Sequence, residues 1–470
     1  MMEETSCRSQ DVRRAVLSLA LPSMLAMLAS GAGVFLDALL LARAGAQAAP
    51  AAGCAFPLTA LIQTIGFTFG MGAGSAVSRL KGRGDGETAG RCSACALLLA
   101  HALGAVCCAA GLALHAPLLR LLAAPQEALG EAAAYTRCVL LSAPAVCFSL
   151  VVSSLLRGVG QTLPNLAAYG AGSAAGAGLS VWLVLFMGRG AAGAGIALLV
   201  RETLTALILL AYGLRALPRG RRRPRALLRL FPCCAPRLSI LREIMRSGLP
   251  TLLRQGAMTA ATLLLTRACA AFGASVIAGM GLALRLLALI ASGVIGFGQG
   301  FQPVCGIHLG AGQEEPVRKA YRFCMRCVVI ALSLLGAALF PLAGPLLSRL
   351  AADAQAAAFA ASVLRAQALV LPAQGAVVMM TMLTQAAGLP VRATLVSASR
   401  QGYVLIPLAL LLPRFFGQAG LVLCQSAADL VSLPLCWLLT HGLLQHMPVQ
   451  TGSMPRARIA VDEQGGSGVQ

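Results

Sequence analysis

Long apolar stretches recur along the whole chain, and they restrict its possible folds more than any other feature. Glycine, proline and arginine divide them into twelve segments, each reaching the roughly 20 residues that a helix needs to cross a bilayer. The segments are 15–42, 50–77, 92–115, 134–156, 163–187, 191–213, 247–270, 276–305, 320–347, 356–385, 393–413 and 419–445. Only 11% of the residues are charged, whereas a soluble protein carries about 25%. The pattern predicts an all-α polytopic membrane protein with twelve transmembrane helices.

The basic residues are distributed unevenly between the two sides of the predicted bundle. A net charge of +21 could indicate nucleic-acid binding, but most of the 37 Lys and Arg residues lie in short connections between spans. They favour one side, as in the connections that contain residues 79–91 and 318–326. Cytoplasmic loops of membrane proteins carry such an excess. We therefore expect both termini to be cytoplasmic, a lipid bilayer as the large partner, and no nucleic acid.

An internal repeat relates the two halves of the chain. Pro22 in LALPSML and Pro250 in SGLPTLL stand 228 positions apart, and GFTFGMG (66–72) matches GFGQGFQ (296–302) at an offset of 230. The matches occur in the same order in both halves, and each half contains six spans. Parallel repeats of this kind are related by an axis along the membrane normal. The sequence thus predicts two six-helix lobes related by a pseudo-two-fold axis along that normal.

The longest polar connection, RALPRGRRRPRALLRLFPCCAPR, divides the chain near its midpoint. It separates two predicted lobes, and a polar segment follows the last span. The predicted organisation is an N-lobe (1–214), a basic cytoplasmic linker (215–246), a C-lobe (247–446) and a disordered cytoplasmic tail (447–470).

No catalytic or metal-binding motif stands out in the sequence. The chain lacks HExxH, GxxxxGK[ST] and GxSxG, and its five histidines are scattered. Most of the 16 cysteines lie within spans, where cysteine acts as a small apolar residue. We therefore expect neither an enzyme nor a metal or cofactor site. Without an ATP-binding loop, any transport should be driven by an ion gradient.

Three acidic residues lie well inside predicted spans: Asp37 in VFLDALLL, Glu202 and Asp429. An ionisable group at the centre of a bilayer costs about 2.5–3.5 kcal/mol, so such groups normally face a cavity or a charged partner and handle ions, protons or substrate. Arg201 directly precedes Glu202. Neighbours in a helix point about 100° apart, so we expect these two side chains not to face each other.

Several ordered motifs resemble those of the MATE (multidrug and toxic compound extrusion) family, and they look closest to its DinF-like bacterial branch. LPSMLAMLASGAGVFLDALLLARAG is similar to the family's first helix, with Asp37 at its membrane-embedded acid. IQTIGFTFGMGAGSAVSRLKGRGD resembles the second helix and the loop after it. Similar stretches match the seventh, eighth, tenth and eleventh helices, and Asp429 matches an acid common in the twelfth. The resemblance covers roughly residues 15–445.

This resemblance implies a secondary antiporter that exports organic, often cationic or amphipathic, compounds in exchange for H+ or Na+. Two lobes would expose a central cavity to each side of the bacterial cytoplasmic membrane in turn. The resemblance also implies a monomer. It makes Arg285, Gln299, Gln255 and Asp429 candidates for the wall of the substrate cavity.

The fifth predicted helix departs from the family pattern. Relatives carry Asn-x-x-x-Asp there, beside the first-helix acid, whereas this chain has Gly176 and Ser180. Glu202 stands where the family usually has Gln, so we hypothesise that it relocates the second carboxylate. The predicted cation-coupling site then consists of Asp37, Glu202 and Ser180. Because Na+ needs several oxygen ligands and a proton needs only one carboxylate, the departure favours H+ as the coupling ion.

Two alternatives stay open at this point. A lipid-linked precursor flippase of the same superfamily would need a markedly basic cavity, which Arg254, Arg267 and Arg285 could supply. The other alternative is a family member that has lost coupling and transports nothing, because the fifth-helix Asn and Asp are missing.

Overall fold

The computed structural model describes residues 9–44, 48–122, 128–216, 238–351 and 353–445, and it is helical almost throughout. The first half contains α1 (Ser9–Arg43), α2 (Ala48–Cys54), α3 (Phe56–Gly82), α4 (Gly86–Ala113), α5 (His115–Leu121), α6 (Leu129–Gly158), α7 (Leu163–Val181), the π-helical turn η2 (Trp182–Phe186) and α8 (Gly190–Ala216). The second half contains α10 (Leu238–Ala270), α11 (Ala274–Gly310), α12 (Glu314–Leu350), α13 (Ala354–Ala386), α14 (Pro390–Ala398), the π-helical turn η4 (Ser399–Tyr403) and α15 (Leu405–Gln445).

The predicted architecture of twelve spans is confirmed. Within the described ranges, ten helical segments are long and apolar enough to cross a membrane. One of these segments, Pro390–Leu443, holds two spans, because Gly417 (φ 58°, ψ −133°) interrupts the helix inside α15. The chain reverses direction at this glycine. Ser399 Oγ lies 3.1 Å from Cys436 Sγ, although the two residues stand far before and far after Gly417 in the sequence. The remaining span is α10.

α10 begins earlier than its predicted span. It starts at Leu238 rather than at residue 247, and its first turns carry Arg242, Glu243 and Arg246. These charges lower its hydropathy, so its apolar part alone could be recognised in the sequence. Residues 217–237 of the predicted linker and the predicted tail (447–470) lie outside the described residues. The predicted lobe boundaries therefore stay predictions.

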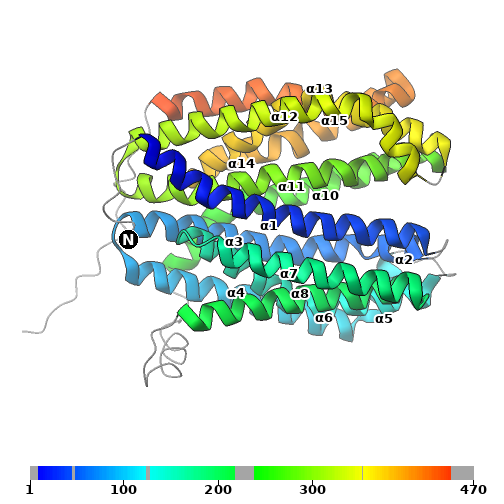
Figure 1. Cartoon of the computed structure of the whole chain (residues 1–470), viewed down its shortest axis with the longest axis horizontal. Helices are drawn as coiled ribbons and strands as arrows, with labels where there is room; N and C mark the ends of the chain where they lie inside the picture. Colours follow the sequence, from blue (N-terminus) through cyan, green and yellow to red (C-terminus); the bar gives the residue numbers. More distant parts are fainter. Residues whose placement is uncertain (1–8, 45–47, 123–127, 217–237, 352, 446–470) are drawn as a thin grey trace, which may run out of the picture.

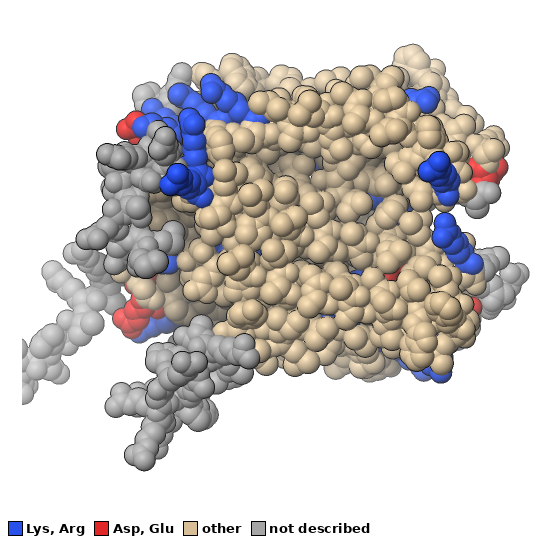
Figure 2. All heavy atoms as spheres, viewed as in Figure 1, with Lys and Arg blue, Asp and Glu red and all other residues tan. Residues whose placement is uncertain are grey.

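The long helices run side by side between the two ends of a bundle (Figure 1). Helices of the first half pack together and helices of the second half pack together, and the two groups meet where α1 contacts α11 and α3 contacts α10. In Figure 2, Lys, Arg, Asp and Glu gather at the two ends, and a band of other residues lies between them. This band matches the hydrocarbon core of a bilayer. The chain is therefore a two-lobed, multi-pass membrane protein.

Glycines bring the two lobes into backbone contact. A Cβ atom on Gly82 of α3 would lie 2.1 Å from the carbonyl oxygen of Ile307, and one on Gly310 of α11 would lie 2.2 Å from that of Arg79. Each of these contacts repeats the other at an offset of 228 positions. Reciprocal contacts of this kind arise when a two-fold axis passes between the two elements. The predicted pseudo-two-fold relation between the lobes is thus confirmed.

The offset of 230 predicted for the second and eighth spans is wrong. At 228 positions, Gly300 corresponds to Gly72 rather than to Gly70. Gly72 packs on Gly248 of α10, and Gly300 packs on Ala20 of α1, so both lie across the lobe interface. Gly70 instead packs against α6 inside its own lobe. A shift of two residues turns a helix by roughly 200°, and a glycine-rich stretch matches itself almost equally well in either register.

Polar contacts of Arg79 tie the lobes together at the same end of the bundle. Its Nη2 donates to Glu243 Oε1 (2.8 Å) and to Ser247 Oγ (3.0 Å), both on α10. Its Nη1 donates to the carbonyl oxygen of Ala386 on α13 (3.4 Å). The Arg79 side chain is only 8% exposed. Glu243 is 30% exposed, so the pair lies at the boundary with solvent, at the end of the bundle where α3 and α11 finish.

Replacing Gly82 with Ala should lower the thermal unfolding temperature of the detergent-solubilised protein. The added methyl group would collide with the Ile307 carbonyl, and overpacking of this kind typically costs about 1–3 kcal/mol. Gly90→Ala is the matched control, because Gly90 is also helical and a Cβ atom there meets nothing within 4 Å. Equal unfolding temperatures for Gly82→Ala and the wild type would contradict the close backbone contact.

Candidate functional site

Asp37 of α1 and Glu202 of α8 are brought together around Arg201 of α8. Arg201 Nη1 donates to Asp37 Oδ2 at 2.7 Å, and Arg201 Nε donates to Glu202 Oε1 at 3.2 Å. The exposed fractions of the side chains are 13% for Asp37, 19% for Glu202 and 7% for Arg201. We call these three residues the N-lobe triad. Breaking a buried ion pair is far more costly than breaking an exposed one, so the triad constrains how α1 and α8 pack.

The expectation that Arg201 and Glu202 do not face each other is wrong. Their backbone positions diverge as neighbours in a helix do, but the long Arg201 side chain places its guanidinium between the two carboxylates. The predicted cation-coupling site did not include Arg201. An arginine inside an apolar span was itself an indication, because such a residue needs a partner.

Small residues on two helices make room for the Arg201 side chain. A Cβ atom on Gly176 of α7 would lie 2.8 Å from Arg201 Cβ, and one on Gly172 would lie 2.9 Å from the Arg201 carbonyl oxygen. Gly33 of α1 faces Arg201 Nη1, at 3.5 Å from the position of its missing Cβ. The Asn that the family resemblance places at position 176 would collide with this arginine. The position of the Arg201 side chain therefore requires glycine at 176.

Ser180 of α7, the third predicted member of the coupling site, is fully buried beside Asp37. Among the described residues, neither its hydroxyl nor Asp37 Oδ1 makes a hydrogen bond of standard geometry. Tyr135 of α6 lies near Asp37, and Tyr169 of α7 lies near Glu202. Buried acceptors without donors are costly. This side of Asp37 is thus where an added proton would be stabilised.

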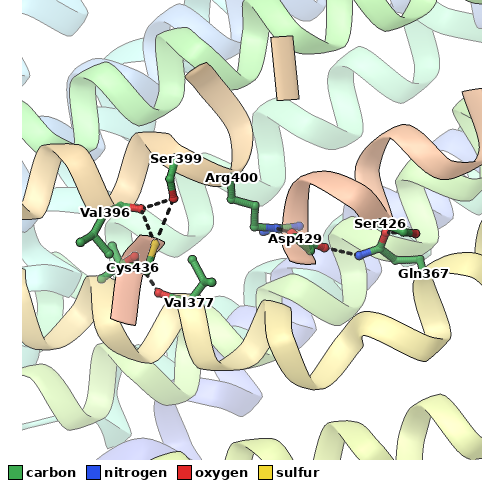
Figure 3. Close-up of polar contacts among 9 residues, drawn as sticks. Gln367, Val377, Val396, Ser399, Arg400, Ser426, Asp429 and Cys436 are labelled. Carbon is green, nitrogen blue, oxygen red and sulfur yellow. Dashed lines mark hydrogen bonds and ion pairs between the residues drawn. The ribbon is translucent and has the colours of Figure 1, made fainter. Parts of the chain in front are cut away.

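Asp429 lies in a separate cluster in the C-lobe (Figure 3). Its fully buried carboxylate accepts hydrogen bonds from Nε of Arg400, on η4, and from Nε2 of Gln367, on α13. Ser426 Oγ donates to Gln367 Oε1 at 3.2 Å. The cluster joins α13, η4 and α15 by satisfied polar contacts, which favours a stabilising role. The place of Asp429 in a substrate cavity stays a prediction. Arg400 and Gln367 had not been predicted as its partners.

The two charged clusters occupy equivalent places in the repeat, with the charges reversed. At the offset of 228 positions, Arg201 corresponds to Asp429, and Gly172 corresponds to Arg400. Gly172 packs against Arg201 in the N-lobe, just as Arg400 contacts Asp429 in the C-lobe. The N-lobe arginine faces a glycine across this helix contact. It therefore finds its carboxylates on α1 and on its own helix instead.

The remaining predicted cavity residues are spread over the C-lobe. Gln299 of α11 lines a small cavity where the lobes meet, together with residues that include Ser75 of α3 and Arg157 of α6. Gln299 Oε1 has no partner among the described residues. Gln255 is buried on α10, and Arg285 is exposed on α11. The predicted roles of these residues in substrate binding stay predictions.

Two lobes related by an internal repeat, with charged clusters inside each lobe and a cavity between them, define a membrane transporter of the parallel-repeat class. The MatE family model matches residues 22–182 and 250–411, once in each half of the chain. The protein therefore belongs to the MATE family, and it is a transporter rather than an enzyme. Its placement in the DinF-like branch stays a prediction.

Relatives and solved structures agree with this assignment. Multidrug export protein MepA of Staphylococcus saprophyticus is 22% identical over 398 residues, which cover 85% of this chain and 86% of that protein. A multidrug resistance MATE family transporter in an outward-facing conformation superposes with a TM-score of 0.84 at 23% identity, over 94% of this chain and 99% of its own. A MOP superfamily transporter from Pyrococcus furiosus, whose binding pocket is described as having reverse polarity, superposes with a TM-score of 0.83 at 22% identity, over 94% and 100%.

Replacing Asp429 with Ala should strongly lower the thermal unfolding temperature. The change leaves the Arg400 guanidinium, only 11% exposed, without a counter-charge, and breaking a buried pair in this way costs about 3–5 kcal/mol. Glu315→Ala is the control, because it removes a solvent-exposed partner of Lys319 and should leave the unfolding temperature nearly unchanged. Similar losses for the two variants would show that burial of the C-lobe pair does not matter.

Proposed function

We propose that the protein is a secondary antiporter that exports organic, cationic or amphipathic compounds across the bacterial cytoplasmic membrane in exchange for protons. The main support is the N-lobe triad, which places two carboxylates and one guanidinium inside a lobe of a MATE family transporter. With both carboxylates ionised, the triad carries one net negative charge, and one proton would neutralise it. The related MepA proteins are named as multidrug exporters, which supports an organic substrate.

The geometry of the triad favours a proton over Na+. The guanidinium already engages Asp37 Oδ2, and Oδ1 and the Ser180 hydroxyl are buried oxygens that lack a hydrogen-bond partner in this part of the described chain. A Na+ ion would need further oxygen ligands and would lie next to a fixed positive charge. A proton needs one carboxylate oxygen. When Asp37 accepts it, Arg201 still has Glu202 as a counter-charge, so the buried group as a whole becomes neutral.

Export by alternating access is supported by where the lobes touch. The close glycine contacts between α1 and α11 run from Ala20 to Gly31, and Arg79 closes the same end of the bundle. Asp37 lies beyond Gly31, farther from this end. The basic connections at this end support a cytoplasmic orientation for it, so the lobes contact each other on the side that we assign to the cytoplasm. One chain supplies both lobes, so a monomer suffices.

A lipid-linked precursor flippase is the second candidate, and positive charge without an ion-pair partner in the membrane-spanning helices favours it. Arg157, Arg254 and Arg285 form no ion pair with a carboxylate of the described residues. Arg157, which lines the cavity between the lobes, is held instead by the hydroxyls of Ser153 (2.5 Å) and Ser154 (2.8 Å). A pyrophosphate group would satisfy such arginines.

The export proposal is tested in proteoliposomes that carry a proton gradient and a cationic dye. The wild type should move the dye, and Asp37→Asn should slow gradient-driven movement about tenfold or more, because the proton acceptor is lost. Asp353→Asn is the matched control. Asp353 is an exposed cap of α13, and Asn caps a helix as well as Asp does.

Gradient-driven movement that survives Asp37→Asn would reject the coupling role. A wild type that moves no dye but transfers a lipid-linked pyrophosphate would establish the second candidate. A wild type that moves neither would match the alternative in which the chain has lost transport.

The role of Glu202 is tested by Glu202→Gln, which keeps the side-chain shape and removes the charge. If Glu202 supplies the second carboxylate, Arg201 loses its alternative partner and proton-driven transport should fall several-fold. Glu87→Gln is the control, since Glu87 lies on the surface and its side chain is 76% exposed. Unchanged transport by Glu202→Gln, at equal protein levels, would remove Glu202 from the mechanism.

A further inference from the structure

The oxygens around Arg201 are arranged as the ligands of a cation would be. Asp37 contributes a carboxylate from α1, Glu202 contributes one from α8, and the Ser180 hydroxyl lies beside Asp37 on α7. Oxygen atoms from several helices at mid-span form the sites of small cations in many transporters. Here the positive charge at the centre belongs to the protein itself. The guanidinium lies 2.7 Å from one carboxylate and 3.2 Å from the other.

Close packing fixes the position of the Arg201 guanidinium in this site. The Arg201 side chain is 7% exposed and packs over Gly176, where any Cβ atom would be too close. Thr205 Oγ1, one turn along α8, donates to the Arg201 carbonyl oxygen at 2.8 Å. Gly172 approaches the same carbonyl from α7. The backbone and the aliphatic part of the side chain are thus held by close packing, which leaves the charge at one position.

We propose that Arg201 is a tethered cation that occupies this site and determines its ion selectivity, so that the site accepts a proton and rejects Na+. This inference deepens the proposed proton antiport and rests on it for the role of the proton. Arg201 acts as a specificity-determining residue.

Charge explains the selectivity. The groups that face Asp37 and Glu202 are Arg201 on α8, Tyr135 on α6, and Ser180 and Tyr169 on α7. Arg201 is the positive group of this set, and a Na+ ion entering beside it would be repelled strongly in a medium of low dielectric constant. A proton becomes covalently bound to a carboxylate oxygen, so it brings no ion that needs its own shell of ligands. Without the guanidinium, two buried carboxylates would attract a free cation.

The test measures binding of radioactive sodium to purified protein in detergent, at an alkaline pH where both carboxylates are ionised. The wild type and Arg201→Lys, which keeps the charge, should bind no Na+. Arg201→Gln should bind Na+ stoichiometrically. The double variant Arg201→Gln/Asp37→Asn should lose this binding, because one of the two carboxylates is gone. Thermal unfolding in NaCl and in choline chloride at equal ionic strength gives a second readout, with Na+ raising the unfolding temperature of Arg201→Gln alone.

Sodium binding by the wild type, or no sodium binding by folded Arg201→Gln, would overturn the proposal. If Arg201→Gln folds only in NaCl, that result supports it. If this variant folds in neither salt, the wild type and Arg201→Lys still decide the matter, because sodium binding by either contradicts a tethered cation. Binding is measured without transport, so a failure of proton-driven export would leave the selectivity result standing, and sodium binding by the wild type would leave export itself untouched.

Discussion

A charge buried in a lipid bilayer must find its partner inside the protein, and this constraint organises both lobes. In the N-lobe, Asp37 pairs with Arg201, which also binds Glu202. In the C-lobe, Asp429 pairs with Arg400 and is further held by Gln367. Each cluster joins helices that are far apart in the chain. Because leaving one partner alone would cost several kcal/mol, these pairs select one way of packing the helices within each lobe.

The lobes themselves meet through glycines rather than through apolar side chains. In a bilayer, lipid tails are as apolar as leucine, so helix association depends on close van der Waals contact, which small residues permit. Gly82 and Gly310 provide this contact at one end of the interface, and Gly72 and Gly300 provide it deeper in the bundle. The Arg79–Glu243 pair adds a polar lock at the same end.

The repeat explains why the two charged clusters differ. The same helix–helix contact holds Gly172 against Arg201 in one lobe and Arg400 against Asp429 in the other. In the C-lobe, Arg400 and Asp429 neutralise each other within that contact, as expected for a stabilising ion pair. In the N-lobe, Gly172 offers no charge, so Arg201 pairs with Asp37 on α1, the acid that the family resemblance associates with coupling. Both carboxylate oxygens of the C-lobe ion pair are thus hydrogen-bonded, whereas beside the N-lobe pair Asp37 Oδ1 and the Ser180 hydroxyl lack hydrogen-bond partners.

The sequence predicted the twelve spans from the length of its apolar stretches, the two lobes from the internal repeat and the family from its ordered motifs. Through the family resemblance it also predicted that Asp37, Glu202 and Ser180 belong together. It did not predict Arg201 as their centre, because helix geometry points neighbours apart and only the reach of a long side chain overrides it. It placed the repeat two residues out of register in α3 and α11, because glycines match glycines at several offsets. Which carboxylate meets which arginine was decided by the tertiary structure, since ion pairing depends on distances between helices that no local pattern specifies.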